Sequence, residues 1–121
     1  NERRRAVAAA YDKAFAGTGF TEPQPVPMHC LPNRHLYAIR VPDRDDMRAY
    51  LDDQGVCTGV HYPVPLHLHP RFRRLGFGRG DFPGAEEFAR VVLSLPVHPG
   101  LTEGQIAHVI DCVRDFGGSM R

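Results

Sequence analysis

Residues 59–72, GVHYPVPLHLHPRF, carry the densest group of chemically active side chains in this 121-residue chain. That stretch contains His61, Tyr62, His67 and His69, with three prolines between or directly after them. Neutral imidazole is a common zinc ligand, and imidazole and phenol groups both donate hydrogen bonds. The stretch is therefore a candidate metal site, a candidate binding site for a polar ligand, or a set of histidines held by backbone partners.

The spacing of the histidines argues against a closed metal site. His61, His67 and His69 form an H-x5-H-x-H pattern, which does not match the ligand spacing of structural zinc sites. The stretch contains no cysteine or carboxylate to complete a tetrahedral shell, and two prolines hold the first two histidines apart. We expect weak, non-specific zinc binding at most, so a histidine-based zinc module is the lesser alternative.

The prolines favour recognition of a polar ligand instead. Pro63 and Pro65 restrict the residues that precede them to extended geometry. His61, Tyr62 and His67 would then stand on a rigid rim as hydrogen-bond donors. Such donors suit an anionic ligand such as a phosphate or a sugar phosphate. The alternative, that one or two of the histidines only bond to the backbone, stays open.

Other kinds of chemistry have weaker support in the sequence. The two serines, Ser94 and Ser119, lie in no nucleophile-elbow context, and no cysteine has a catalytic signature around it. The segment GFGRG (76–80) is rich in glycine but does not lie between a strand and a helix. It predicts a flexible loop rather than a phosphate cradle.

The composition is that of one ordinary globular domain, with 42% hydrophobic and 24% charged residues. A net charge of +1 and scattered arginines give no basic footprint for nucleic acid, and Arg3–Arg5 and Arg71–Arg74 are expected to be solvated. The odd cysteine count, at Cys30, Cys57 and Cys112, predicts a reducing cytoplasm rather than a disulfide framework. We expect no signal peptide, and no apolar run approaches the roughly 18 residues of a membrane span.

Amphipathic helices and short strands are expected to position the candidate residues. The sequence predicts helices over 1–17, 42–55, 82–92 and 102–117, strands over 35–41 and 56–62, and an extended segment over 93–100. Four prolines exclude a helix from 21–32, which is expected to be an extended edge or a loop. The order indicates a small α+β domain whose sheet is covered by helices on one side.

Local signals define the ends and apolar faces of these elements. Asn1 and Asp43 are expected N-caps, Gly17, Gly55 and Gly117 are expected helix stops, and Thr102-x-x-Gln105 forms a capping box. The expected apolar faces of the helices are Val7, Ala10, Tyr11, Ala14 and Phe15; Met47, Tyr50 and Leu51; Ala85, Phe88, Ala89 and Val92; and Ile106, Val109, Ile110 and Val113. In the strand over 35–41, Leu36 and Ala38 are expected on one face and Tyr37, Ile39 and Val41 on the other.

Several segments, in their order along the chain, resemble one protein family. They are HLYAIRV (35–41), the capped helix that follows it, TGVHYPVPLH (58–67), DFPGAEE (81–87) and LSLPVHPGLT (93–102). Together they resemble the C-terminal segment of the DegT/DnrJ-type nucleotide-sugar aminotransferases, which use pyridoxal phosphate. The resemblance runs from Asn1 to about Phe116, which is nearly the whole chain.

The resemblance implies that residues 1–121 form one C-terminal small domain of a longer fold-type I enzyme, with 117–121 as a tail. In that family a large domain carries the pyridoxal phosphate and its Schiff-base lysine, and the enzyme works as a homodimer. The only lysine here, Lys13, lies on the polar face of a predicted helix and is not expected to form a Schiff base. The missing initial Met agrees with a fragment, so we expect neither catalytic residues nor a bound cofactor in this chain.

The resemblance also implies roles for individual residues. His61 and Tyr62 match the H-Y-P element and His67 matches the later histidine, near the sugar-nucleotide end of the family's active site. His35 matches the histidine before the central strand, with either a substrate-related or a structural role. The implied reaction transfers an amino group from an amino acid, such as glutamate or glutamine, to a keto-sugar nucleotide for an antibiotic or a polysaccharide. The chain alone is expected to be inactive.

The alternative is a free-standing, non-catalytic domain that binds or regulates a partner. A severed small domain should also expose the apolar surface that met the large domain, because monomers rarely leave large apolar patches bare. We expect that surface on the first helix, at Val7, Tyr11 and Phe15, together with self-association or marginal stability.

Overall fold

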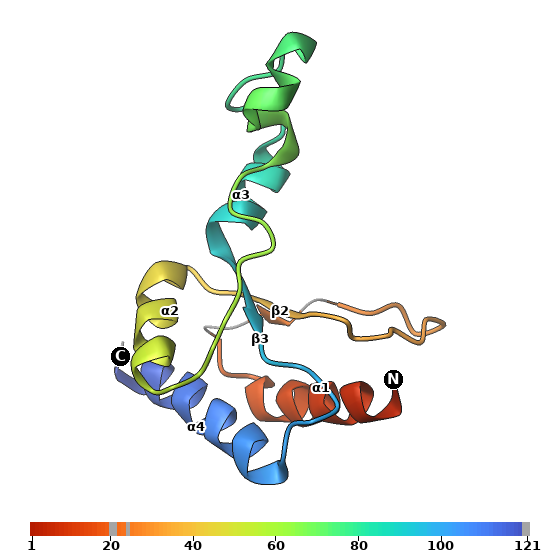
Figure 1. The fold of residues 1–121 in the computed structure, drawn as a ribbon, viewed down its shortest axis with the longest axis vertical. Coiled ribbons are helices and arrows are strands. Elements are labelled where there is room, and N and C mark those ends of the chain that lie inside the picture. The colour runs from red at the N-terminus through yellow and green to blue at the C-terminus, as the bar shows by residue number, and fades with distance from the viewer. Residues whose placement is uncertain (20–21, 24, 120–121) are drawn as a thin grey trace.

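The computed structural model describes residues 1–19, 22–23 and 25–119. Its elements are α1 (Glu2–Phe15), β1 (Glu22–Pro23), β2 (Tyr37–Arg40), α2 (Arg44–Asp53), the 3₁₀ helices η1 (Leu66–Leu68) and η2 (Pro70–Leu75), α3 (Pro83–Val91), β3 (Val92–Leu95) and α4 (Glu103–Ser119). Helices α1, α2 and α4 gather with the small sheet, whereas residues 62–91 project away from it (Figure 1). We call these two regions the body and the arm. The predicted α+β class is confirmed.

The sheet has the strand order β1-β2-β3, and both pairings are antiparallel. Tyr37 pairs with Leu95 at one end of the β2–β3 ladder, and Arg40 pairs with Val92 at the other. Tyr37, Ile39 and Val41 are all buried, so of the two faces predicted for this strand, this is the one that meets the core. The short segment of β1 agrees with the extended edge expected over 21–32, of which residues 21 and 24 lie outside the described part of the chain.

The strand predicted over 56–62 is reduced to one antiparallel bridge, between Gly59 and Ser94. The two residues exchange both backbone hydrogen bonds, at 3.0 and 2.7 Å. Pairing ends on one side because β3 runs into Pro96, which has no N–H to donate. It ends on the other side because the chain before Val92 is helical. The prediction of a full strand was therefore wrong, although the segment does lie beside β3.

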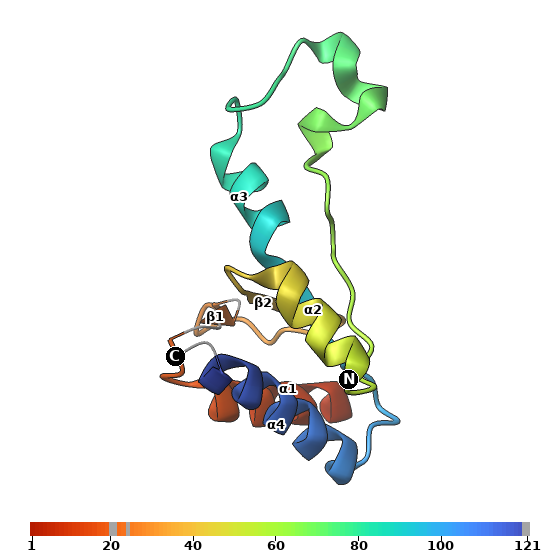
Figure 2. The same cartoon turned by 90° about the vertical axis from the view of Figure 1, so that its left-hand side faces the viewer.

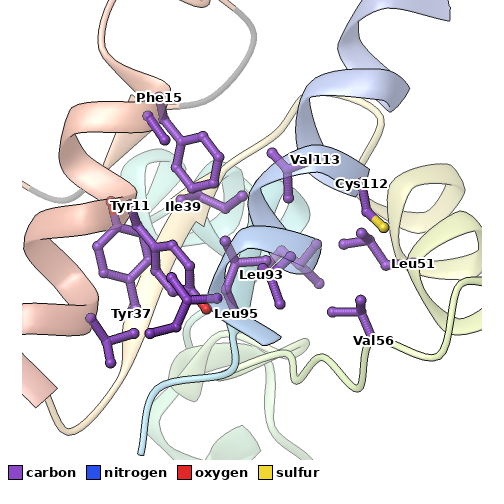
Figure 3. Packing of buried hydrophobic residues seen from close by; sticks show 14 of the residues in the cluster. Tyr11, Phe15, Tyr37, Ile39, Leu51, Val56, Leu93, Leu95, Cys112 and Val113 are labelled. Atoms are coloured by element: carbon purple, nitrogen blue, oxygen red, sulfur yellow. The ribbon is translucent and has the colours of Figure 1, made fainter. Parts of the chain in front are cut away.

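The body is held by one apolar core between the sheet and its three helices. Figure 3 shows side chains from α1, the sheet, α2 and α4 meeting in this core, among them Tyr11, Leu51, Leu93 and Val113. Helix α4 contacts both α1 and α2, and Figure 2 shows α4 lying alongside α1.

The prediction that the face of α1 is an exposed contact surface was wrong. Val7, Tyr11 and Phe15 are among the most deeply buried side chains of the chain. They are buried because α1 turns this face to α4 and to the sheet, so the chain itself covers the surface that the sequence assigned to a missing domain.

Polar contacts tie α1 to the sheet from its buried side. The Tyr37 hydroxyl donates to Asp12 Oδ1 at 2.7 Å, and Arg34 donates to Asp12 Oδ2 at 3.3 Å. The Tyr11 hydroxyl donates to the carbonyl of Pro96 at 2.9 Å. Burial raises the pKa of Tyr11 to about 12, and burial and then the hydrogen bond to Asp12 raise the pKa of Tyr37 further.

The capping box before α4 is formed as predicted. Thr102 Oγ1 accepts the N–H of Gln105 at 3.2 Å, and Gln105 Oε1 accepts the N–H of Thr102 at 3.0 Å. Helix α4 does not stop at Gly117 but continues to Ser119. Glycine is only a weak signal inside a packed helix, and Gly117 is buried. The last two residues of the predicted tail, Met120 and Arg121, lie outside the described residues.

The other predicted helix ends hold in part. Gly17 and Gly55 follow α1 and α2 with φ values of +72° and +75°, the left-handed region that favours glycine at such ends. Asn1 and Asp43 occupy the N-cap positions, but neither makes a side-chain capping bond.

Helix α3 differs from the others because it belongs to the arm. Ala89 is buried, as expected. Val92 is also buried, but it begins β3 rather than ending the helix. Ala85 and Phe88, expected to face inward, are exposed. Within the described chain, α1, α2 and α4 form no layer over α3, because α3 projects away from them (Figure 2). The sequence of α3 thus has an apolar stripe, but no described residues bury its Ala85 and Phe88.

Candidate functional site

The arm consists of two limbs that join at its tip. Residues 62–65 run outward as an extended segment, η1 and η2 occupy the tip, and α3 returns to β3 (Figure 2). Seven of the ten exposed large apolar side chains in the described chain lie on it: Tyr62, Val64, Leu66, Leu75, Phe77, Phe82 and Phe88. The stretch of histidines and prolines therefore begins at the base of the arm and continues to its tip.

His61 lies where the arm meets the sheet. Its Nδ1 is 3.0 Å from the hydroxyl oxygen of Ser94, a buried residue on β3. The ring also packs against Gly59, because a Cβ atom at position 59 would come within 2.6 Å of the His61 Cε1. The bridge between Gly59 and Ser94 thus places the ring against the edge of the sheet.

Tyr62 follows on the outward limb and is turned toward solvent. Its side chain is 72% exposed, and its ring meets the His61 ring edge-on with centroids 5.5 Å apart. The structure therefore places His61 and Tyr62 side by side at the base of the arm. The predicted rim of hydrogen-bond donors stays a prediction for these two residues.

His67 has a different environment. It is only 9% exposed, and its Nε2 lies 3.0 Å from Glu86 Oε1 on α3. The same carboxylate oxygen accepts the N–H of Gly80 at 2.7 Å, and the Phe82 ring stands edge-on to the imidazole at 4.8 Å. A carboxylate accepts only, so His67 donates through Nε2. This cluster joins the outward limb to the returning limb.

The contacts of Glu86 also affect its ionisation. The hydrogen bond from His67, and then the N–H of Gly80, hold the pKa of this carboxyl below its usual value. The ionised form is therefore the one that keeps the two limbs together. His67 is satisfied by this carboxylate rather than by the backbone partner that the sequence alternative allowed.

His35 lies apart from the other candidates. It is exposed and precedes β2, and no described contact joins it to His61, Tyr62 or His67. The structure thus brings His61 and Tyr62 together, moves His67 inward, and leaves His35 separate.

The described residues contain no group of three or more histidine, cysteine or acidic side chains arranged to hold a metal ion. None of the helices in that part of the chain has the length and apolar character that a membrane span needs. Lys13 is exposed in the last turn of α1, away from the buried face of that helix. A Schiff base to pyridoxal phosphate needs a desolvated lysine, so Lys13 does not fit that role.

Residues 1–114 match the model of the DegT/DnrJ/EryC1/StrS aminotransferase family. The chain belongs to this family. It is 44% identical over 117 residues to the dTDP-3-amino-3,4,6-trideoxy-alpha-D-glucose transaminase of Streptomyces venezuelae. The matched region covers 96% of this chain and 31% of that relative. It is also 46% identical over 82 residues to a pleiotropic regulatory protein of Geobacillus stearothermophilus, covering 68% of the chain and 22% of that protein.

Solved structures of family members have the same fold. The structure of Streptomyces venezuelae DesV, solved with a ketimine intermediate, superposes with a TM-score of 0.93 at 41% identity and covers 97% of this chain and 32% of DesV. A sugar aminotransferase of Streptococcus pneumoniae in its PLP form gives a TM-score of 0.87 at 27% identity, covering 99% of this chain and 32% of that one. The chain thus spans about a third of the length of these relatives.

Two residues that shape the site were not singled out as functional by the sequence. Ser94 and Glu86 lie within LSLP and FPGAEE, the segments that carry the family resemblance. Their partners, His61 and His67, are 33 and 19 residues away in the sequence. Only the resemblance of these segments as a pair could have pointed to them.

Proposed function

We propose that this chain is the C-terminal small domain of a pyridoxal-phosphate-dependent sugar aminotransferase. The whole enzyme would transfer an amino group from an amino acid such as glutamate to a keto-sugar nucleotide, in antibiotic or polysaccharide sugar biosynthesis. The observation that carries the proposal is the family match over residues 1–114 together with 44% identity to a dTDP-amino-sugar transaminase. The unpaired state of all three cysteines is compatible with the cytoplasm as its location.

In this proposal His61 and Tyr62 contact the nucleotide-linked sugar. Both stand at the base of the arm, and Tyr62 is the more exposed of the two. Imidazole N–H and phenol O–H groups are suitable donors to sugar hydroxyl and phosphate oxygens. His67 would act indirectly, because its bond to Glu86 keeps the two limbs of the arm together. His35 is retained as a more distant candidate for the same substrate.

The cofactor and the amino donor would be held by the part of the enzyme beyond this chain. Lys13 offers no Schiff-base site, so pyridoxal phosphate would supply its carbonyl chemistry from the larger domain of a homodimer. The exposed apolar side chains of the arm would pack against that domain, because patches of this kind mark interaction surfaces.

The test uses the full-length enzyme and compares His61→Ala and Tyr62→Phe with His98→Ala, an exposed histidine of the body. Losing a donor to a charged phosphate costs about 1.5–3 kcal/mol, so His61→Ala should weaken binding of the nucleotide sugar by roughly ten- to a hundredfold. The half-reaction with the amino donor should be unchanged. Unaltered sugar affinity with a slower chemical step in His61→Ala would refute the binding role.

A second candidate is a non-catalytic regulatory domain, which the likeness to a pleiotropic regulatory protein favours. The reading frame upstream of Asn1 separates the two candidates. A preceding cofactor domain with a lysine supports the enzyme, whereas a start codon near Asn1 supports the regulatory domain.

The chain by itself should neither transaminate nor form a Schiff base. The expected result of mixing it with pyridoxal phosphate and reducing with borohydride is no stable label at Lys13. A stoichiometric label at Lys13, lost in Lys13→Arg, would assign the cofactor to this domain.

A further inference from the structure

The Ser94 hydroxyl is a buried polar group in an apolar strand. Its neighbours along β3 are Val92, Leu93 and Leu95, and all four residues are buried. Within the described chain its one hydrogen-bond partner is Nδ1 of His61, at 3.0 Å. A polar side chain at such a position needs its hydrogen bond satisfied.

A hydroxyl and a ring nitrogen can share a hydrogen in two ways. If Nδ1–H of His61 donated, the hydroxyl hydrogen of Ser94 would have no acceptor among the described residues and would be buried without a partner. If the hydroxyl donates, its hydrogen is used and Nδ1 serves as the acceptor. Because an unsatisfied buried donor is costly, the second arrangement is favoured. The ring hydrogen then resides on Nε2.

We propose that Ser94 is a positioning residue that donates to Nδ1 of His61 and so holds this histidine as the Nε2–H tautomer. The Nε2–H is then the group that His61 offers to a polar oxygen of the nucleotide-linked sugar. The identity of this ligand rests on the proposed function, whereas the tautomer does not.

Gly59 supports this arrangement by leaving room for the ring. The two backbone bonds between Gly59 and Ser94 fix the spacing of the two residues. A methyl group at position 59 would lie 2.6 Å from the His61 Cε1, so the ring would have to shift and its contact with the hydroxyl would be disturbed. Gly59→Ala therefore disturbs the same contact without touching Ser94.

The first test is ¹⁵N NMR of the histidine rings in the 121-residue chain, at a pH where the rings are neutral. We expect a protonated Nε2 and an unprotonated, hydrogen-bonded Nδ1 for His61. His108 is an internal reference, because its Nε2 faces the carbonyl of Gln54 at 2.9 Å and must carry the hydrogen. A protonated Nδ1 in His61 would overturn the proposal.

Variants then test whether Ser94 holds the ring. In Ser94→Ala the Nδ1 shift should lose its hydrogen-bonded character and the two tautomers should mix, while Ser94→Thr should retain the original shifts. Ser119→Ala, which removes a hydroxyl that donates to the carbonyl of Asp115 within α4, is the matched control. Unchanged His61 shifts in Ser94→Ala, with a dispersed spectrum that shows a folded chain, would overturn the proposal.

The second test is kinetic and uses the full-length enzyme. Ser94→Ala and Gly59→Ala should each raise the KM for the nucleotide sugar by about two- to tenfold, the range of one neutral hydrogen bond, with the amino-donor half-reaction unchanged. Ser94→Thr should restore the KM. If His61→Ala weakens sugar binding and Ser94→Ala does not, the positioning role is wrong. If neither changes sugar binding, the proposed substrate role of His61 is wrong.

Discussion

The body buries its large apolar side chains, whereas the arm leaves many of them exposed to solvent. Leu51 on α2 is fully buried in the body core, whereas Leu66 in the outward limb of the arm is 72% exposed. The body encloses its apolar groups between a sheet and three helices, and the arm has no second layer in the described chain. The comparison shows that the buried apolar core and most of the exposed large apolar side chains of the described chain lie in different regions of one small domain.

The contacts that organise each region differ as well. The body relies on a shared apolar core, with buried tyrosine hydroxyls bonded across elements. The arm has a polar cluster around Glu86, which joins its two limbs. Changes in the body should therefore act on global unfolding, whereas changes in the arm should act locally or on association.

The largest expected effect comes from a matched pair of leucine truncations. Leu51→Ala should lower the free energy of unfolding by about 2–5 kcal/mol, because it leaves a cavity in the core. Leu66→Ala should change it by less than about 0.5 kcal/mol, because that side chain is exposed. Urea denaturation followed by circular dichroism measures both. Equal losses in the two variants would mean that the arm unfolds together with the body as one core.

A smaller effect is expected for the buried phenol that links α1 to β2. Tyr37→Phe removes the bond to Asp12 and should cost about 1–2 kcal/mol of unfolding free energy, since hydrogen bonds to charged groups contribute about 1.5–3 kcal/mol and Asp12 is partly exposed. Tyr62→Phe on the arm is the control and should change nothing measurable. If Tyr62→Phe were the more destabilising of the two, the division between body and arm would be wrong.

The buried phenols of Tyr11 and Tyr37 predict a loss of stability at high pH. The pKa values of Tyr11 and Tyr37 are raised in the folded chain, so their neutral forms stabilise it fully below the ordinary tyrosine pKa. That stabilisation is lost as the pH rises through the folded values. Ultraviolet titration should show these two phenols ionising together with unfolding. Their ionisation near pH 10 in a chain that stays folded would contradict the buried geometry.

The exposed apolar groups of the arm should control association rather than stability. Phe77→Ser and Phe88→Ser should reduce self-association of the chain at high concentration and leave the melting temperature nearly unchanged. Phe15→Ser, which places a hydroxyl in the body core, should instead unfold the chain. Analytical ultracentrifugation and thermal melts measure the two properties. A chain that stays monomeric at high concentration would remove the basis for this prediction.

The smallest expected effect is local and concerns Glu86. Its pKa is lowered in the folded chain, so the link between the limbs is intact above the ordinary glutamate pKa and is lost as the pH falls through the folded value. The amide of Gly80, which bonds to Glu86, should report this loss in an NMR pH titration. Glu86→Gln should abolish the titration of that amide, and Glu87→Gln should leave it unaltered.

Much of the body was predictable because its signals are local. The period of apolar residues located α1, α2 and α4, and Thr102 with Gln105 formed the capping box that their spacing predicts. The alternation in HLYAIRV predicts that Tyr37 and Ile39 share a face, and in the structure that face meets the core. These features depend on neighbours within one or two turns of chain, so the sequence carries them directly.

The site was predictable only in part, because its contacts join residues distant in sequence. The histidine-rich stretch was identified, and His61 and Tyr62 do lie side by side. The inward position of His67 was missed, since it depends on a carboxylate on α3. The apolar stripe of α1 indicated that a partner surface exists, but could not tell whether another domain or this chain's own α4 supplies it.

The sequence by itself determined the family, the α+β class and most helix ends, because these follow from motifs, periodicity and capping chemistry within short segments. The tertiary structure decided which apolar faces are covered, which histidines are exposed and which residues hold them. The physical reason is that burial and side-chain hydrogen bonds depend on contacts between elements that are distant in the sequence. Residues 59 and 94 become partners at the edge of one sheet, and no local pattern records that approach.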